Sequence, residues 1–266
     1  MKKHLLRVNW GLNLARFTGF LSLALGAVVL LGWYLHEPAL IQVNPAFVPM
    51  QYNTALGFAL GGLALLGVAG PWPRIAGITG VIVLLTGILT LIEYGFGVDL
   101  HIDQLFMEHY IDLKTSNPGR MAPNTALCFS LTGVAVLLAA LFRGRARITS
   151  WTATLGTLII SLGIVALAGY LIGVESAYGW GHMTRMAIHT AAGFIILGVG
   201  FVGLAWTGQG TGVSSLVNYC RTGCHRLSVS PDLPSPSLSG RHCPHTSSAW
   251  SARWGSAPKT FPMKVC

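Results

Sequence analysis

The chain has 266 residues, of which 52% are hydrophobic and only 9% are charged. This composition excludes an ordinary soluble globular domain and is typical of a membrane protein. The formal net charge of +9 would suit a nucleic-acid-binding protein. The basic residues, however, lie at the ends of apolar runs, so we expect no nucleic-acid partner.

Six apolar runs are long enough to cross about 30 Å of hydrocarbon as helices. In chain order they cover residues 14–35, 53–70, 75–96, 124–142, 149–173 and 186–206. Because backbone groups in lipid must be hydrogen-bonded internally, we predict an all-α fold, a polytopic bundle of six transmembrane helices. The lipid bilayer is therefore the first expected partner.

Charged residues are sorted between the two ends of these runs. Most acidic residues follow the first, third and fifth runs, whereas most basic residues flank the opposite ends. The positive-inside bias predicts a multi-pass protein of the bacterial cytoplasmic (inner) membrane, with both termini in the cytoplasm and the acidic loops outside. Lys114, Arg120 and Arg185 are exceptions. Residues 1–13, which include basic side chains, are predicted to form a cytoplasmic N-terminus. The apolar run after them is too long for a signal peptide, which indicates an uncleaved first span.

One phrase occurs three times, and the architecture is organised around it. It covers residues 50–58, 121–129 and 186–194, and each copy has Met first, Asn or His fourth, then Thr-Ala, and Phe last. Recurrence at a near-constant period predicts one structural unit used three times. Each predicted unit is an outward helix, an outer loop and an inward helix that the phrase begins. The three predicted hairpins cover residues 14–70, 75–142 and 149–206.

Two compatible interpretations of the phrase are open. In the first, Asn or Thr caps the start of the inward helix, and the small residues Gly57, Cys128 and Gly193 let a neighbouring backbone approach. In the second, the polar residues also line an outward-facing pocket for an unknown small ligand or membrane cue. The candidate pocket residues are Asn53, Thr54, Asn124, Thr125, His189, Thr190, Tyr34, Glu93, Tyr94 and Tyr170. No catalytic residue, metal ligand or cofactor is predicted.

Three further features have a structural and a functional interpretation. His189 replaces Asn in the third copy, and we favour a hydrogen-bonded substitute over a titrating or metal-binding histidine. We expect Glu93, at a helix end, to reach the membrane interface rather than form a buried site. The second outer loop carries His101, Asp103, Glu108, His109 and Asp112. These groups attract cations, but their spacing matches no closed metal site, so we predict a solvated loop. Tryptophans such as Trp33 lie at span ends, as interfacial anchors do.

Residues 207–266 differ in character from the rest. They are rich in Ser, Pro and basic residues and contain Cys220, Cys224, Cys243 and Cys266. A cytoplasmic location keeps such thiols reduced, so we expect no disulfide framework. The composition predicts a disordered tail. An alternative hypothesis is that the tail is translated out of frame, since one permissible codon choice for residues 233–243, shifted by two nucleotides, spells an apolar string.

The phrase Pro-Gly-Arg-Met-Ala-Pro-Asn-Thr-Ala at residues 118–126, with its two counterparts, carries a resemblance. Residues 10–206 resemble the multi-helix membrane input region that precedes PAS, histidine-kinase or diguanylate cyclase domains in bacterial sensor proteins. The resemblance implies detection of an outer or membrane-borne cue and its transmission through the last helix to a cytoplasmic homodimer.

The chain contains no kinase phospho-acceptor segment, ATP-binding glycine-rich box or GGDEF-like sequence. We therefore expect a non-catalytic sensory input module, truncated before its output domain. The alternatives are a small membrane transporter or membrane enzyme and a structural subunit of a membrane complex.

Overall fold

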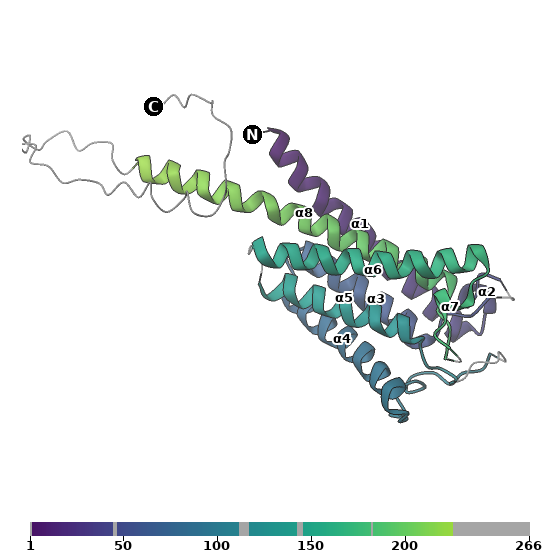
Figure 1. Ribbon diagram of the computed structural model, residues 1–266. Helices are drawn as coiled ribbons and strands as arrows, with labels where there is room; N and C mark the ends of the chain where they lie inside the picture. Colours follow the sequence, from purple (N-terminus) through teal and green to yellow (C-terminus); the bar gives the residue numbers. More distant parts are fainter. Residues whose placement is uncertain (1, 45–46, 112–116, 143–145, 182, 226–266) are drawn as a thin grey trace, which may run out of the picture. The chain divides into compact units, whose positions relative to one another are not determined.

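The computed structural model describes residues 2–44, 47–111, 117–142, 146–181 and 183–225. Within these ranges the chain forms helices, turns and loops but no strand, which confirms the all-α prediction. The helices, shown in Figure 1, are α1 (Lys2–Leu35), α2 (Pro38–Ile41), α3 (Tyr52–Ala69), α4 (Pro73–Phe96), α5 (Pro123–Leu141), α6 (Ala146–Ile172), α7 (Glu175–Tyr178) and α8 (Ile188–His225).

Six helices in the described part of the chain are long and apolar enough to cross a membrane, as predicted. Their apolar stretches are Trp10–Leu35, Tyr52–Ala69, Pro73–Phe96, Pro123–Leu141, Arg147–Ile172 and Ile188–Thr207. The main difference is at α8, which does not end at Trp206 but continues as helix to His225. No proline interrupts its hydrogen-bond ladder. The rest of the predicted disordered or out-of-frame tail, residues 226–266, lies outside the described residues.

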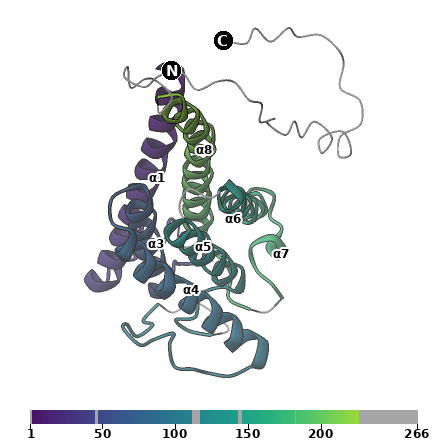
Figure 2. The ribbon, with the colours of Figure 1, turned by 90° about the vertical axis from the view of Figure 1, so that its left-hand side faces the viewer.

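The spanning helices divide into an inner and an outer set within the unit formed by residues 1–222. In one 18-residue apolar window of each helix, 67%, 56% and 56% of the residues are buried in α3, α5 and α8, against 33%, 33% and 28% in α1, α4 and α6. Figure 2 shows α5 between α3 and α6, with α4 on one side and α8 on the other. The outer helices are therefore the ones that leave most of their apolar surface uncovered by the rest of the bundle.

Three phenylalanines hold the inner helices together. Phe58, Phe129 and Phe194 are fully buried, and their ring centroids lie 5.2, 4.8 and 4.9 Å apart. A Cβ atom added at Gly57 or Gly193 would lie within 2.7 Å of a phenyl ring of the neighbouring inner helix. Close packing at these two small residues is therefore confirmed, but the group that approaches is a phenyl ring and not the neighbouring backbone that was predicted. We call the three rings the Phe triad.

Each outer helix packs its backbone directly against the inner helix that follows it in the chain. The glycines at these contacts are Gly26 on α1, Gly87 on α4 and Gly163 on α6. A Cβ atom at these positions would lie 2.5, 2.6 and 2.8 Å from the carbonyl oxygens of Ala55, Ala126 and Ala191, respectively. Small residues of this kind let two helices approach closely where the hydrophobic effect cannot drive them together.

An aromatic side chain near the end of each outer helix donates a hydrogen bond to the first residue of the phrase. Trp33 Nε1, Tyr94 Oη and Tyr170 Oη donate to the carbonyl oxygens of Met50, Met121 and Met186 at 3.0, 3.1 and 2.7 Å. In α1 the donor is Trp33 and not the adjacent Tyr34, whose hydroxyl bonds that of Tyr52. The two side chains differ because successive helical residues point about 100° apart. Trp33 is only 1% exposed, so it is not the predicted interfacial anchor.

The Tyr170→Phe variant tests this contact. Loss of the hydroxyl leaves the Met186 carbonyl without its donor, and we expect the free energy of unfolding to fall by about 0.5–1.5 kcal/mol. The matched control is Tyr34→Phe, because Tyr34 is 59% exposed and its hydroxyl bonds that of Tyr52, at 2.8 Å, rather than a main-chain carbonyl. Unfolding of both purified variants in detergent measures the difference, and equal losses would contradict the prediction.

Candidate functional site

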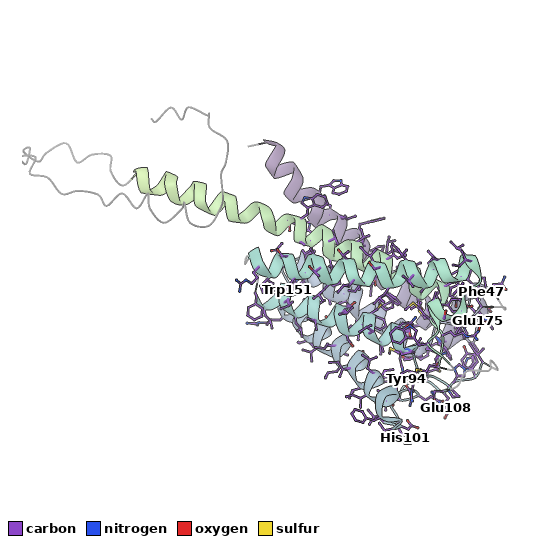
Figure 3. All side chains as sticks on the ribbon, in the orientation of Figure 1. Phe47, Tyr94, His101, Glu108, Trp151 and Glu175 are labelled. Carbon is purple, nitrogen blue, oxygen red and sulfur yellow. The ribbon has the colours of Figure 1, made fainter. Side chains whose placement is uncertain are left out.

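The segments between α1 and α3, α4 and α5, and α6 and α8 lie at one end of the bundle, which we call the loop end. Figure 3 labels Phe47, Tyr94, His101, Glu108 and Glu175 at this end, and Trp151 away from it. All ten predicted pocket residues belong to these segments or to the helix turns next to them.

The polar residues of the phrase do not occupy the cap positions of their helices. The helices α3, α5 and α8 begin before Asn53, Asn124 and His189, which lie inside the first helical turn. The cap residues of α3 and α5 form no side-chain cap hydrogen bond. The predicted cap position is therefore wrong, although Asn124 Oδ1 does accept a hydrogen bond from the Thr125 main-chain nitrogen at 3.0 Å, as predicted for a residue at a helix start. In α5 the reason is visible, because Pro123 suits the first helical position and begins the helix one residue before Asn124.

These residues instead tie each inner helix to the loop of another hairpin. The partners of Asn53, Asn124 and His189 are the main chains of Asp103, Tyr178 and Ile41, in that order. The Nδ2 atoms of Asn53 and Asn124 donate to carbonyl oxygens at 3.1 and 3.2 Å. The His189 imidazole lies near the Ile41 main chain, but neither ring nitrogen has a hydrogen-bond partner among the described residues, so the predicted hydrogen-bonded role is not confirmed. The contacts run from the first hairpin to the second, the second to the third and the third to the first.

The ten predicted residues do not come together as one pocket. Asn53, Asn124 and His189 each face a different loop, and Thr54, Thr125 and Thr190 are at most 3% exposed. Tyr94 and Tyr170 bind main-chain carbonyls, whereas Tyr34 is largely exposed. Of the ten residues, Glu93 belongs to a different site, in which it pairs with Arg120.

Glu93 is fully buried, so the expectation that it reaches the interface is wrong. Its Oε1 atom lies 3.3 Å from Arg120 Nη2 and accepts a hydrogen bond from the Leu100 main-chain nitrogen at 2.9 Å. The loop after α4 folds back and brings a guanidinium to the carboxylate. A buried carboxylate is retained where such a partner offsets part of its desolvation cost.

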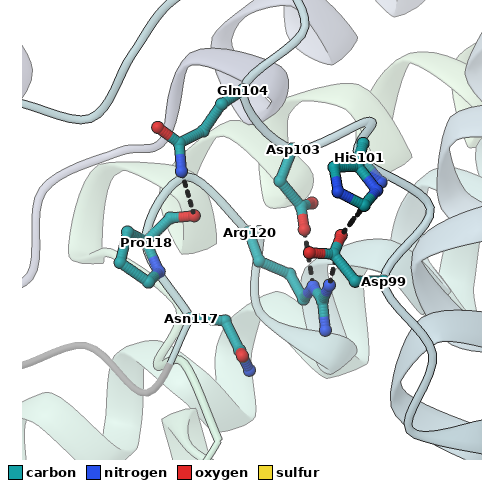
Figure 4. Close-up of a pocket in the computed structure, with 7 residues that line it drawn as sticks. All are labelled: Asp99, His101, Asp103, Gln104, Asn117, Pro118 and Arg120. Carbon is teal, nitrogen blue, oxygen red and sulfur yellow. Dashed lines mark hydrogen bonds and ion pairs between the residues drawn. The ribbon is translucent and has the colours of Figure 1, made fainter.

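Two more carboxylates meet the same arginine. Arg120 Nε lies 2.6 Å from Asp103 Oδ2, and Nη2 lies 3.6 Å from Asp99 Oδ1. Figure 4 shows both aspartates directed at the guanidinium. The guanidinium carbon also lies 5.5 Å from the centre of the Tyr94 ring. We call Glu93, Asp99, Asp103 and Arg120 the Arg120 cluster.

Sequence reasoning noted Arg120 only as an exception to the charge pattern. A signal was present, because Arg120 follows an acidic loop and Glu93 interrupts an otherwise apolar helix. Two oppositely charged residues that each break a pattern are candidates for a pair. The pairing itself needed the fold, since Glu93 and Arg120 are far apart in the sequence.

The Arg120 cluster has more negative than positive groups among the described residues. Neither Glu93 Oε2 nor Asp103 Oδ1 has a hydrogen-bond partner in that part of the chain. Burial raises the pKa of the Asp103 carboxyl above its ordinary value, although Arg120 acts in the opposite direction. Burial acts to lower the pKa of Arg120, but its hydrogen bond with Asp103 and the carboxylate charges raise it on balance. The cluster therefore favours the arrival of additional positive charge.

A hollow of about 310 Å³ reaches the cluster from the loop end (Figure 4). It is lined by Asp99, His101, Asp103, Gln104, Asn117, Pro118 and Arg120. A second hollow, of about 480 Å³, is lined by His36, Gln104, Leu105, Phe106, Met107, Glu108 and Tyr110. None of the ten predicted pocket residues lines either hollow.

The solvated loop predicted between α4 and α5 is present only in part. His101 and Glu108 are exposed, as predicted, but Asp103 is only 7% exposed. The His109 ring packs on Trp33 with centroids 5.8 Å apart. Asp112 lies outside the described residues. The loop is thus anchored to the bundle through Arg120 and through its aromatic side chains.

Comparison with protein-family models, with curated proteins and with solved structures finds no significant match. The chemistry available at the loop end is electrostatic: a set of clustered carboxylates, accessible through a hollow, can bind a cation or a proton.

Proposed function

We propose that the chain is a membrane-embedded sensory input module. The observation that carries this proposal is the length of α8, a single 38-residue helix that starts at the loop end. At 1.5 Å per residue it measures about 57 Å, nearly twice the hydrocarbon thickness of a bilayer. A continuous helix of this length can transmit a displacement from one side of a membrane to the other.

The proposed module consists of three two-helix hairpins in a bacterial cytoplasmic membrane, with the loop end outside and both termini in the cytoplasm. Support comes from contacts that recur at corresponding positions of the phrase. These are the aromatic bonds to the three methionine carbonyls, the glycine contacts with the three alanine carbonyls, and the Phe triad. A homodimer is the proposed assembly, since helix displacements are readily transmitted between paired output domains.

The loop end is coupled to α8 by direct contacts. His189, in the first turn of α8, interacts with the main chain of Ile41 in the first loop. Further along, α8 packs closely on α1, since a Cβ atom at Gly11 would lie 2.5 Å from the Gly203 carbonyl oxygen. Packed interfaces tend to have discrete arrangements rather than deform continuously. A change in the loops is therefore expected to shift α8 relative to α1.

The Phe triad favours a sensor over a transporter. Its three rings are fully buried in mutual contact where the inner helices meet. A transport path between α3, α5 and α8 would have to displace all three rings. A structural subunit is the remaining alternative. For such a subunit, we expect that rotation of α8 changes no output.

Fusion of residues 1–225 to a diguanylate cyclase reporter tests the proposal. Insertion of one alanine after Thr207 rotates the reporter by about 100° and insertion of four restores the phase approximately. We expect cyclase activity to change with one insertion, to return with four, and to respond to substitution of Arg120 at the loop end. Activity that is indifferent both to the phase of α8 and to Arg120 would count against a sensory role.

A further inference from the structure

The Arg120 cluster places three carboxylates around one guanidinium. Glu93 is fully buried and Asp103 is 7% exposed, so two of the three charges are largely removed from water. A buried charge without full compensation costs several kcal/mol in real proteins. Of the described residues, Arg120 alone forms an ion pair with more than one of them.

The geometry suits a metal ion. Glu93, Asp99 and Asp103 each offer one oxygen, and these three oxygens all lie within 4.8 Å of one another. Ca²⁺ binds oxygen at 2.3–2.6 Å, so two ligands of one ion can be at most roughly 5 Å apart. One ion can therefore reach all three residues with little movement of the chain.

An independent observation also points to a ligand. Glu93 Oε2 and Asp103 Oδ1 are buried and have no hydrogen-bond partner among the described residues. Buried polar atoms in native proteins are nearly always satisfied, and an exception commonly marks an ion or another ligand. Asp103 also lines the hollow through which an ion would enter.

We propose that the Arg120 cluster is a binding site for a hard divalent cation, with Ca²⁺ as the preferred ion. The ion competes with Arg120 for the carboxylates. Nη2 holds Glu93 and Asp99 only at 3.3 and 3.6 Å, whereas Nε holds Asp103 at 2.6 Å. Because Nε and Nη2 belong to one planar group, an ion that binds all three carboxylates displaces the guanidinium as a whole, and water in the hollow completes its coordination. Ca²⁺ tolerates the irregular geometry of a loop better than Mg²⁺, which demands a near-ideal octahedron.

The cation site would give the proposed sensor its signal, and this signalling role rests on the proposed function. Arg120 precedes Met121, whose carbonyl oxygen binds Tyr94 at the end of α4. Asn124, in the first turn of α5, binds the segment that leads to α8, through the Tyr178 carbonyl oxygen. Displacement of the guanidinium by an ion would therefore act on α5 and on the third loop.

Calcium titration of the full-length protein, purified in detergent and stripped with EDTA, tests the site. Calorimetry should show one saturable Ca²⁺ site, and Ca²⁺ should raise the thermal midpoint more than Mg²⁺ at equal concentration. Asp99→Asn and Asp103→Asn should each weaken binding by about tenfold or more, because affinity follows the charge count of the ligands. The matched control is Glu175→Gln, which removes an exposed carboxylate that also pairs with an arginine, Arg185, at 2.6 Å.

Arg120→Gln separates a cation site from a merely structural ion pair. Removal of the competing charge should tighten Ca²⁺ binding by about tenfold, since binding depends on the net charge of the site. Calcium should also restore much of the thermal stability that this variant loses in EDTA. A structural pair alone predicts a loss of stability that Ca²⁺ does not restore.

Three outcomes would overturn the site. They are the absence of Ca²⁺ binding, binding that survives Asp99→Asn and Asp103→Asn unchanged, and a midpoint that responds to protons but not to Ca²⁺. The cyclase fusion keeps the two proposals distinguishable. Calcium binding without a change in cyclase activity supports the site and removes its signalling role, whereas phase-dependent activity without calcium binding supports the sensor and removes the site.

Discussion

Replacement of Arg120 by Gln should lower the free energy of unfolding by about 3–5 kcal/mol in calcium-free buffer near neutral pH. The change leaves Glu93 and Asp103 buried without their counter-charge, and it removes the residue that fastens the second loop to the end of α4. Denaturant unfolding in detergent, followed by circular dichroism, measures the loss. No other single charged substitution among the described residues is expected to cost as much.

The control for this prediction is Arg185→Gln in the third loop. Its pair with Glu175 is as short as that of Arg120 with Asp103, at 2.6 Å, but the two side chains are 41% and 62% exposed. Exposed pairs contribute about 0–1 kcal/mol, so this variant should be nearly as stable as the parent. Equal losses for Arg120→Gln and Arg185→Gln would show that burial of the cluster does not determine its energetics.

Phe129→Ala should strongly destabilise the centre of the bundle. Phe129 contacts both other rings of the Phe triad, with centroids 5.2 Å from Phe58 and 4.9 Å from Phe194. Truncation of a buried Phe costs about 3–5 kcal/mol, because contacts are lost and the cavity collapses only in part. The same unfolding measurement in detergent gives the loss directly.

Phe20→Ala is the matched control for the triad. Phe20 lies on the outer helix α1 and is 61% exposed, so its ring faces the surrounding lipid or detergent. We expect its truncation to change the free energy of unfolding by no more than about 0.5 kcal/mol. Similar losses at both positions would mean that the triad does not hold α3, α5 and α8 together.

The six spans were predictable because each depends only on the residues of its own segment. A run of apolar residues of membrane length must satisfy its own backbone hydrogen bonds, and an α-helix does this within the segment. The predicted runs accordingly match the apolar helices to within a few residues, apart from the start of the first. Close packing at Gly57 and Gly193 was also predictable, since small residues at one place in a repeated phrase indicate a recurrent contact.

The candidate site was predicted only in part. Asn53, Asn124 and His189 were correctly singled out as polar positions in an apolar bundle, but their partners are loop main chains rather than a shared ligand. Glu93 was singled out for its place in the helix and assigned to the interface. Its burial depends on Arg120, which no periodicity or spacing connects to it.

An all-helical membrane protein with six apolar spans follows from the sequence, because helix formation in hydrocarbon depends on segment length and composition. Only the folded chain reveals which helices are inner, that Trp33 rather than Tyr34 binds the Met50 carbonyl, and that Arg120 gathers three carboxylates. These outcomes depend on contacts between residues such as Asn124 and Tyr178, which are 54 positions apart and meet only when the loops fold over the helix ends.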